Sequence, residues 1–470
     1  MGIGDIGASR YIPNVRDFLR EHYKFFLAFA AAGLLLRLLF FFYFPAITDD
    51  SRNYADFAQN WLQHAVYGLT EDGKAVPTDS RLPGYPGFLV IIFALFGVGN
   101  FKAAMLAQIP FELATCLLIA NLAFRTAGRR AAKIAFVLNA LCPFLANYAA
   151  AALTETLEIF FTALALSCAT TALDRIEEGR SSMKFWAGAG AAIAACILLR
   201  PDGGILLASL GLYMGWLVLR KRNNRQQLIP LLIGGVLTAF IALAPLIPWG
   251  LRNLRTLHRF EPLVPRYATE ADELVPHGFN RWTMTWIVDY ASVEEIFWTD
   301  TGLFDASKLP SRAFDSAAQR TQTVELISEY NQSKQFNPEL DRRFGEVAEE
   351  RIRTHPLRYY LELPVLRVAD MWLRPRTEML PPDVRWWEFN DAVSSSITAV
   401  GFGVLNLAYV AAALLALFRR PLPRYAGLLI VFVVLRSAFL GTVENPEPRY
   451  TLECYPVVIL MASALIHERK

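Results

Sequence analysis

Ten apolar runs, each close to 20 residues long, limit what this chain can fold into more than any other feature. An α-helix rises 1.5 Å per residue, so crossing a hydrocarbon core of about 30 Å takes roughly 20 apolar residues. With 54% apolar and 19% charged residues among 470, the composition excludes a soluble globular enzyme and a disordered protein. The sequence therefore predicts an all-α polytopic membrane protein. The runs lie near residues 25–44, 102–124, 131–147, 153–173, 184–200, 203–219, 228–249, 391–418, 424–442 and 450–466.

Short basic loops predict how these runs are oriented. Cytoplasmic loops of membrane proteins are enriched in Lys and Arg, and three short loops here are rich in arginine: 125–133, 220–225 and 419–424. All three fall on one side, together with both basic termini, only if the shorter run 84–98 does not cross. We therefore predict about ten transmembrane helices with both termini cytoplasmic. Residues 84–98 are expected to form a juxtamembrane helix in the first outer loop, 45–101.

This topology divides the chain into three parts. Residues 1–249 form an N-terminal transmembrane catalytic module, residues 250–390 an extracytoplasmic domain, and residues 391–470 the C-terminal transmembrane helices. Within the middle part, apolar periodicity predicts helices over 344–353 and 359–373. The extracytoplasmic domain is therefore expected to be mostly helical.

Charge and cysteine usage argue against several kinds of partner. The 46 basic and 43 acidic residues give a net charge of +3, which is too balanced to indicate a nucleic-acid partner. The five cysteines lie singly, and neither they nor the six histidines have the spacing of a disulfide framework or a metal site. No set of metal ligands is therefore predicted.

Acidic side chains gather at three points that this topology places on the outer face. Asp49 and Asp50 follow the first run, Glu155 lies at the start of the run 153–173, and the stretch 444–450 (ENPEPRY) precedes the last run. Ionisable groups at membrane depth are costly, so each marks a functional hypothesis. The arginines predicted on the same face are Arg81, Arg200, Arg252 and Arg449.

Each of these groups also has a purely structural explanation. Asp50 could cap the helix that carries Tyr54, since Asp is favoured at helix N-caps. Glu155 could be a first-turn charge stabilised by the helix dipole, and Arg449 could extend its charge to the membrane interface. The convergence of three acids and several arginines on one face favours a functional site over these separate explanations.

Several short motifs follow one another in a fixed order along the chain. They are Asp50 with Tyr54, Arg81–Pro86 (RLPGYP), Leu153–Glu155 (LTE), Arg200–Asp202 (RPD), Trp249 with Arg252, and Arg449 with Tyr450. This order resembles the GT-C superfamily of membrane glycosyltransferases. Within it, the chain is most similar to the branch of protein O-mannosyltransferases and lipid A aminoarabinose transferases. The resemblance covers roughly residues 20–255 and the last 30.

The resemblance implies an inverting transferase that acts on the extracytoplasmic face of a bacterial inner membrane. Its donor is expected to be a sugar on a polyprenyl phosphate, and its acceptor a hydroxyl of a protein, lipid or glycan. The catalytic base of the family matches Asp50, with Asp49 as the competing position, and a second acidic motif matches Glu155. Arg81 is implied to hold the donor phosphate. Further donor contacts are expected from Tyr54, Arg200, Arg252, Arg449 and Tyr450.

This chemistry suits the residue types that the sequence supplies. Phosphate is a competent leaving group, so arginines that stabilise its charge can replace a strong general acid. One carboxylate then suffices to deprotonate the acceptor hydroxyl. A carboxylate beside a second acid and partly removed from water is expected to have a raised pKa. The scheme requires no cofactor or metal, although the acid cluster could accommodate a divalent ion.

Two other functions remain open from the sequence. A lipid-linked glycan ligase or polymerase would use the same membrane setting with longer donors. A non-enzymatic transporter of lipid-linked sugars would carry charges through mid-span positions and show inverted repeats, whereas here the charges cluster at one face. The identity of the sugar and of the acceptor is not determined by the sequence.

Overall fold

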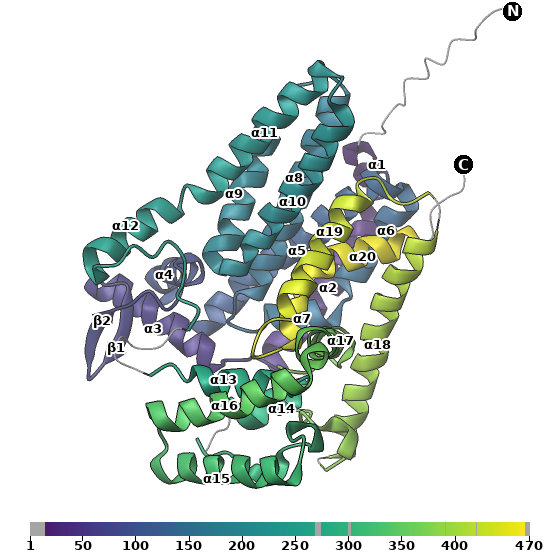
Figure 1. Ribbon diagram of the computed structural model, residues 1–470. Helices are drawn as coiled ribbons and strands as arrows, with labels where there is room; N and C mark the ends of the chain where they lie inside the picture. The colour runs from purple at the N-terminus through teal and green to yellow at the C-terminus, as the bar shows by residue number, and fades with distance from the viewer. Residues whose placement is uncertain (1–14, 268–273, 299–301, 391, 420, 466–470) are drawn as a thin grey trace, which may run out of the picture.

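The computed structural model describes residues 15–267, 274–298, 302–390, 392–419 and 421–465, and Figure 1 shows their arrangement. The first part contains α1 (Val15–Glu21), α2 (Tyr23–Tyr43), α3 (Asp49–His64), β1 (Gly68–Glu71), β2 (Lys74–Pro77), α4 (Gly84–Phe96), α5 (Phe101–Ala127), α6 (Arg129–Ala140), α7 (Pro143–Ala149), α8 (Glu155–Glu177), α9 (Met183–Leu199), the 3-10 turn η1 (Pro201–Gly203), α10 (Gly204–Lys221), α11 (Arg225–Leu243) and α12 (Leu246–Leu257). The middle part contains α13 (His277–Met284), α14 (Tyr290–Ile296), η2 (Ala306–Lys308), η3 (Ser311–Ala313), α15 (Ala317–Ser333), α16 (Pro338–Thr354), the π-helical turn η4 (Arg358–Glu362), α17 (Leu363–Leu373) and η5 (Trp386–Glu388). The last part contains α18 (Val393–Phe418), α19 (Ala426–Leu440), the 3-10 segment η6 (Pro448–Cys454) and α20 (Tyr455–Ala464).

Among the described residues, six helical segments are long and apolar enough to cross a membrane: α2, α5, α8, η1 with α10, α11 with α12, and α18. The pair α6 and α7 would make a seventh span, broken by a 50° bend. The chain is therefore a multi-pass membrane protein, and the predicted all-α membrane fold is confirmed. Each of the ten predicted runs contains a helix, but the number of ten spans is not confirmed, because α9, α19 and α20 have 17, 15 and 10 residues.

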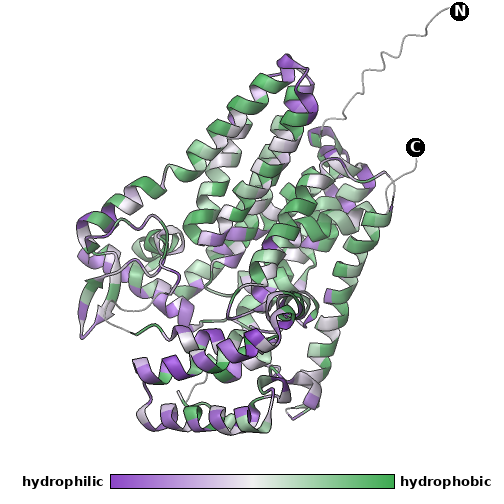
Figure 2. Ribbon diagram, in the orientation of Figure 1, coloured by the Kyte–Doolittle hydropathy of each residue, from purple (hydrophilic) through white to green (hydrophobic). Residues whose placement is uncertain are grey.

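The surfaces of the helices differ between the two ends of the molecule. Figure 2 shows that the long helices carry apolar side chains along most of their length, whereas α15 and α16 are largely hydrophilic. Large apolar side chains such as Leu35, Val236 and Phe418 are exposed on the outside of α2, α11 and α18. Apolar side chains on an outer surface suit contact with lipid tails. By contrast, every residue of α20 is buried among protein.

The three basic loops form ion pairs with acidic residues at the C-terminal end of α8. Asp174 accepts hydrogen bonds from Arg125 and lies 2.6 Å from Arg424, and Glu177 lies 3.3 Å from Lys221. These three cations belong to the three arginine-rich loops of the sequence, so the loops lie at one end of the bundle. The predicted orientation requires this arrangement, because it places all three loops on the same side of the membrane. The N-terminal end of α8 is 23 residues away, or roughly 35 Å along the helix. Which end faces the cytoplasm stays a prediction.

Helix α4 does not have the length of a membrane span. Its 13 residues extend only about 20 Å, whereas the hydrocarbon core is about 30 Å thick. Figure 1 shows α4 along its axis while α8–α11 run up the page, so α4 lies across the long helices. Its first residue, Gly84, packs so closely on the end of α9 that a Cβ would lie 2.5 Å from the Leu198 carbonyl carbon. This close contact fixes the position of the RLPGYP motif.

Residues 277–352 have a hydrophobic core of their own. Phe279 and Trp282 of α13 pack with Phe344 of α16 in this core, which is separate from the main core of the long helices. The predicted helices 344–353 and 359–373 lie within α16 and within η4 and α17. Helix α12 continues past residue 249 to Leu257, so the proposed domain boundary falls inside a helix.

Candidate functional site

The start of α3 is tied to the segment that precedes α8. The Ala46 amide donates to the Ala150 carbonyl at 3.0 Å, and the Ala152 amide donates to the Ala46 carbonyl at 3.2 Å. This short parallel bridge joins the chain just after α2 to the chain just before α8. As a result, Asp50 and Glu155 lie at the same end of the bundle, although 105 residues separate them in the sequence.

Thr48 and Ser51 form the cap at the start of α3. The Ser51 amide donates to Thr48 Oγ1 at 3.3 Å, and the Thr48 amide donates to Ser51 Oγ at 3.0 Å. The helix therefore takes no cap from Asp50, and the capping explanation of that residue is wrong. Asp49 pairs with Arg52 at 2.6 Å, and its side chain is 95% exposed. Asp50, in contrast, turns into the protein.

Two arginines from remote segments hold the carboxylate of Asp50. Arg81 Nη2 donates to Oδ1 at 3.2 Å, and Arg449 Nη2 donates to Oδ2 at 3.0 Å. Burial on its own raises the pKa of Asp50, but the two guanidinium groups outweigh it and hold the pKa below its ordinary value of 3.8. The expectation of a raised pKa is therefore wrong, because the sequence did not reveal that both arginines contact this carboxylate.

Arg449 also connects Asp50 to two further acids. Its Nε lies 2.6 Å from Glu447 Oε2, and its Nη1 lies 3.7 Å from Glu155 Oε1. Tyr450 donates to Glu447 Oε1 at 2.5 Å and thereby helps to hold that carboxylate. The side chain of Arg449 is only 12% exposed, so it is enclosed by protein.

Glu155 is buried, yet its hydrogen-bonding capacity is unused. Neither carboxylate oxygen has a hydrogen-bond partner among the described residues, and the nearest cations are Arg449 and Arg200, the latter at 3.8 Å. As the first residue of α8, Glu155 benefits from the helix dipole. A buried carboxylate without hydrogen bonds is nevertheless costly. Glu155 is therefore placed to accept a hydrogen bond from a ligand.

A second layer of ion pairs lies behind these residues. Arg200 is 3.5 Å from Glu158 and 3.3 Å from Asp202. Arg436, in the middle of α19, is 3.1 Å from Asp202 and 2.5 Å from Glu453. All five side chains except Arg200 are at most 9% exposed. Arg436 was not among the predicted site residues, although an arginine inside an apolar run is itself a functional signal.

Shared ion pairs join these side chains into one charge network. It consists of the carboxylates Asp50, Glu155, Glu158, Asp202, Glu447 and Glu453 and the guanidinium groups Arg81, Arg200, Arg436 and Arg449. With every group ionised, the six carboxylates exceed the four guanidinium groups. An anionic ligand that binds these guanidinium groups would therefore compete with the carboxylates that already pair with them. In the part of the chain that the structure describes, no group of three or more His, Cys, Asp or Glu side chains is arranged to hold a metal ion.

The remaining predicted site residues lie in different places. Tyr54 is buried with its ring edge-on to Tyr85 at 5.1 Å, and it borders the charge network through electrostatic contact with Asp50. Arg252 is not brought to the network. It donates to the carbonyls of Thr78, at 3.0 Å, and Tyr67, and so holds the β1–β2 hairpin against α12. Among the described residues, Arg252 thus makes no ion pair with the charge network, although Tyr67, on which it packs, donates to the Arg81 carbonyl at 3.0 Å.

A family model matches part of the chain and only some of the site residues. Residues 80–249 match the family model described as dolichyl-phosphate-mannose-protein mannosyltransferase. The match includes Arg81, Glu155 and Arg200 but neither Asp50 nor Arg449. No curated protein matches the sequence significantly.

The solved structures that are similar to this chain include two oligosaccharyltransferase structures and one of ArnT. The oligosaccharyltransferase of Archaeoglobus fulgidus tethered with an acceptor peptide is 12% identical, with a TM-score of 0.51 over 95% of this chain and 50% of that chain. The archaeal oligosaccharyltransferase AglB of Archaeoglobus fulgidus, in complex with an inhibitory peptide and a dolichol-phosphate, is 14% identical, with a TM-score of 0.50 and the same coverage. ArnT of Cupriavidus metallidurans bound to undecaprenyl phosphate is 16% identical, with a TM-score of 0.36 over 93% of this chain and 77% of that chain.

The two oligosaccharyltransferase structures establish the fold. At this level of identity they show that the chain has the architecture of GT-C membrane glycosyltransferases, so the predicted resemblance is confirmed. The chain spans about half the length of these oligosaccharyltransferases. Their ligands are therefore properties of those proteins, and the activity of this chain has to be argued from its own residues.

Proposed function

We propose that this protein of the GT-C fold transfers a sugar from a polyprenyl-phosphate donor to an acceptor hydroxyl and inverts the anomeric carbon. The observation that carries the proposal is the meeting of Asp50, Arg81 and Arg449 from three remote segments at one end of the bundle. A carboxylate held between two guanidinium groups combines a proton acceptor with two phosphate-binding groups. The match of residues 80–249 to a mannosyltransferase family model supports the same reaction class.

Donor binding would change the surroundings of Asp50. A guanidinium binds phosphate through two parallel charge-assisted hydrogen bonds. Because Arg81 and Arg449 both pair with Asp50, a donor phosphate that takes two hydrogen bonds from each of them would compete with Asp50 and weaken its ion pairs. Asp50 would then lose the two partners that lower its pKa. The arrival of the donor would in this way make Asp50 a stronger base.

The transfer step then uses the freed carboxylate. Asp50 accepts the proton of the acceptor hydroxyl while the hydroxyl oxygen attacks the anomeric carbon. The bond from that carbon to the phosphate oxygen breaks, and polyprenyl phosphate leaves with the electron pair. Arg81 and Arg449 stabilise the charge on the leaving phosphate. Glu155 accepts a hydrogen bond from a substrate hydroxyl, and this scheme requires no metal or other cofactor.

The other predicted donor contacts border the same place. The Arg200 guanidinium lies 4.5 Å from the centre of the Tyr450 ring, and Tyr54 interacts electrostatically with Asp50. We propose Tyr54, Arg200 and Tyr450 as further donor contacts. We also propose that this end of the bundle is the extracytoplasmic face of a bacterial inner membrane and that both termini are cytoplasmic.

The function is tested by donor consumption. Purified protein in lipid nanodiscs is incubated with a panel of polyprenyl-phosphate monosaccharides, and released polyprenyl phosphate is measured by mass spectrometry. At least one donor is expected to be consumed, at a rate that EDTA does not change. Consumption of lipid-linked oligosaccharides alone would identify a ligase or polymerase. Movement of a lipid-linked sugar across the bilayer without consumption would identify a transporter.

A further inference from the structure

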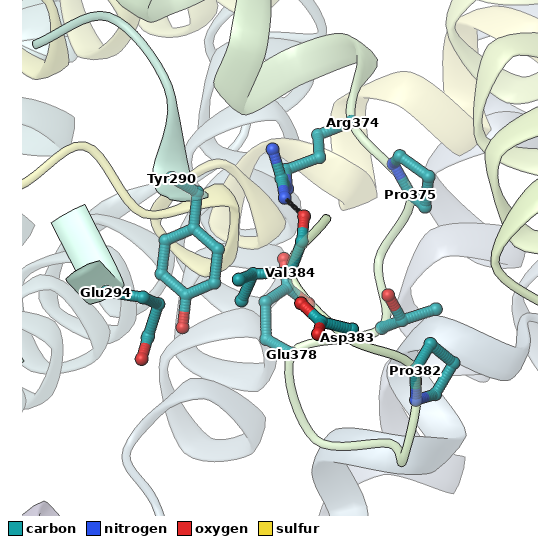
Figure 3. A pocket seen from close by; sticks show the side chains of 9 residues that line it. Tyr290, Glu294, Arg374, Pro375, Glu378, Pro382, Asp383 and Val384 are labelled. Atoms are coloured by element: carbon teal, nitrogen blue, oxygen red, sulfur yellow. Dashed lines mark hydrogen bonds between the residues drawn. The ribbon is translucent and has the colours of Figure 1, made fainter. Parts of the chain in front are cut away.

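A cavity of about 110 Å³ lies between α14 and the loop that follows α17. Helix α14 contributes Tyr290 and Glu294, and the loop contributes Arg374, Glu378 and Asp383. Figure 3 shows the phenol and the carboxylates of these side chains around the same space. The proposed catalytic step does not use any of them.

The wall of this cavity is acidic. Three carboxylates line it, and the one guanidinium, Arg374, is already engaged: it donates to the Val384 carbonyl, lies 3.7 Å from Asp370, and stacks on the rings of Tyr290 and Trp387. An excess of carboxylates repels phosphate. Ionised carboxylates accept hydrogen bonds but donate none, so the wall suits a ligand that is rich in hydroxyl groups.

One of these carboxylates has an unused oxygen. Glu378 Oε1 is buried and has no hydrogen-bond partner among the described residues, whereas Oε2 lies 3.5 Å from the Tyr148 hydroxyl. Burial, opposed by Arg376, raises the pKa of Glu378 above its ordinary value. A buried oxygen without a partner costs free energy that a bound hydroxyl group would offset.

The cavity borders the charge network. Arg376, in the loop that lines the cavity, donates to the Pro448 carbonyl at 2.6 Å, and Pro448 directly precedes Arg449 of the network. Glu447, which pairs with Arg449, also interacts electrostatically with Glu378. A ligand in the cavity would therefore lie next to the proposed reaction centre.

We propose that this cavity is the sugar subsite of the enzyme, and that it accepts the hydroxyl groups of one sugar residue of the donor or of the acceptor. The assignment rests on the proposed function. The size of the cavity agrees with a single sugar ring, since pockets for larger ligands occupy about 300–1,000 Å³. An extended glycan would have to leave the cavity after its first residue.

Binding of simple glycosides tests the subsite without requiring turnover. Saturation-transfer NMR is recorded on the full-length protein in lipid nanodiscs, free of glycoside detergents, with a panel of methyl glycosides. Wild-type protein is expected to bind at least one of them. Glu378→Gln and Asp383→Asn, which keep shape but lose charge, are each expected to weaken binding at least about five-fold, in line with the loss of a hydrogen bond to a charged group. Glu346→Gln, at an exposed position of α16, is the matched control.

Two results would overturn the subsite: no glycoside bound by the wild type, or wild-type affinity in both Glu378→Gln and Asp383→Asn. Preloading with a consumed sugar donor separates the two sources of the sugar. Loss of glycoside binding then assigns the cavity to the donor sugar, and retained binding assigns it to the acceptor; polyprenyl phosphate without sugar is the control. If glycosides bind and Glu378→Gln abolishes binding, but no lipid-linked sugar is consumed, the cavity is still a sugar site and the proposed transfer fails.

Discussion

Asp50 differs from its neighbour Asp49 in every property that matters for acid–base chemistry. Asp49 is exposed and pairs only with Arg52 on the same helix. Asp50 is held by the guanidinium groups of Arg81 and Arg449, and Arg449 also pairs with Glu155 and Glu447. The sequence left the choice between the two positions open, and this geometry favours Asp50 as the proposed base.

Replacing Asp50 by Asn is expected to lower the transfer rate by about 10²–10⁴-fold, because Asn keeps the shape of the side chain but cannot take a proton. Asp49→Asn is expected to stay within about two-fold of the wild type, since exposed ion pairs contribute little. The measurement is the initial rate of polyprenyl phosphate release. An inactive Asp49→Asn together with an active Asp50→Asn would show that the base has been assigned one residue too far along the chain.

The pH dependence of the two kinetic constants is expected to differ. In the free enzyme the pKa of Asp50 lies below 3.8, so the carboxylate is already ionised above that pH and kcat/KM has no acidic limb from Asp50 at higher pH. In the donor complex the arginines bind phosphate, the pKa of Asp50 rises, and the acidic limb of kcat moves to higher pH. Profiles of both constants from about pH 4 to 8 measure this difference. Coincident acidic limbs would mean that the arginines stay on Asp50.

Arg449 contacts three carboxylates at once, and we propose that it also binds the donor phosphate. Arg449→Lys replaces a planar fork by a point charge, so donor affinity is expected to fall by about ten-fold, or 1.4 kcal/mol. The apparent Kd for the donor measures it. Arg436→Lys, in the second layer, is the comparison: an equal loss of affinity there would indicate a change in folding rather than a lost phosphate contact.

At the scale of elements, the β1–β2 hairpin explains a residue that the sequence assigned to the donor. Arg252 joins the hairpin to α12 through two backbone carbonyls. Arg252→Ala is therefore expected to lower the free energy of unfolding by about 1–3 kcal/mol, while the KM for the donor stays unchanged. Thermal melting and donor titration of the same preparation separate the two effects. A raised KM at unchanged melting temperature would return Arg252 to the donor site.

The hairpin itself was not predicted, although its turn carries a recognisable signal. Asp72 and Gly73 have φ angles of 47° and 75°, the left-handed conformation that an Asp-Gly turn supplies. The strands have only four residues each. Such short strands show too little alternation to be identified from periodicity, so only the turn could have indicated them.

For the whole molecule, the topology makes a prediction that single cysteines can test. In a background without the five native cysteines, Arg130→Cys and Asn223→Cys are expected to react with an impermeant reagent from one side of the membrane, and Lys74→Cys and Val98→Cys from the other. All four positions are exposed, and they avoid Gly97, Gly99 and Gly128, where a positive φ would strain any side chain. Labelling of Arg130→Cys and Val98→Cys from the same side would overturn the topology.

Much of the architecture follows from the sequence alone. A helix that crosses a bilayer needs roughly 20 consecutive apolar residues, and such runs can be recognised without knowing the tertiary structure. The runs predicted the helices, the position of α4 outside the set of long spans, and the gathering of three basic loops at one end. They did not settle the number of spans. An apolar helix can face lipid or protein, and α20 is enclosed by protein, which hydropathy cannot distinguish.

The electrostatic character of the site was decided only by the tertiary structure. Arg81 is 31 residues from Asp50 and Arg449 is 399 residues from it, yet both contact the same carboxylate. The sequence identified all three residues as candidates, since each is an ionisable group beside an apolar run. It could not show that they touch, and so it predicted the wrong direction for the pKa of Asp50. Coulombic interactions depend on distance through space, and that distance is set by how α3, the loop before α4 and η6 pack together.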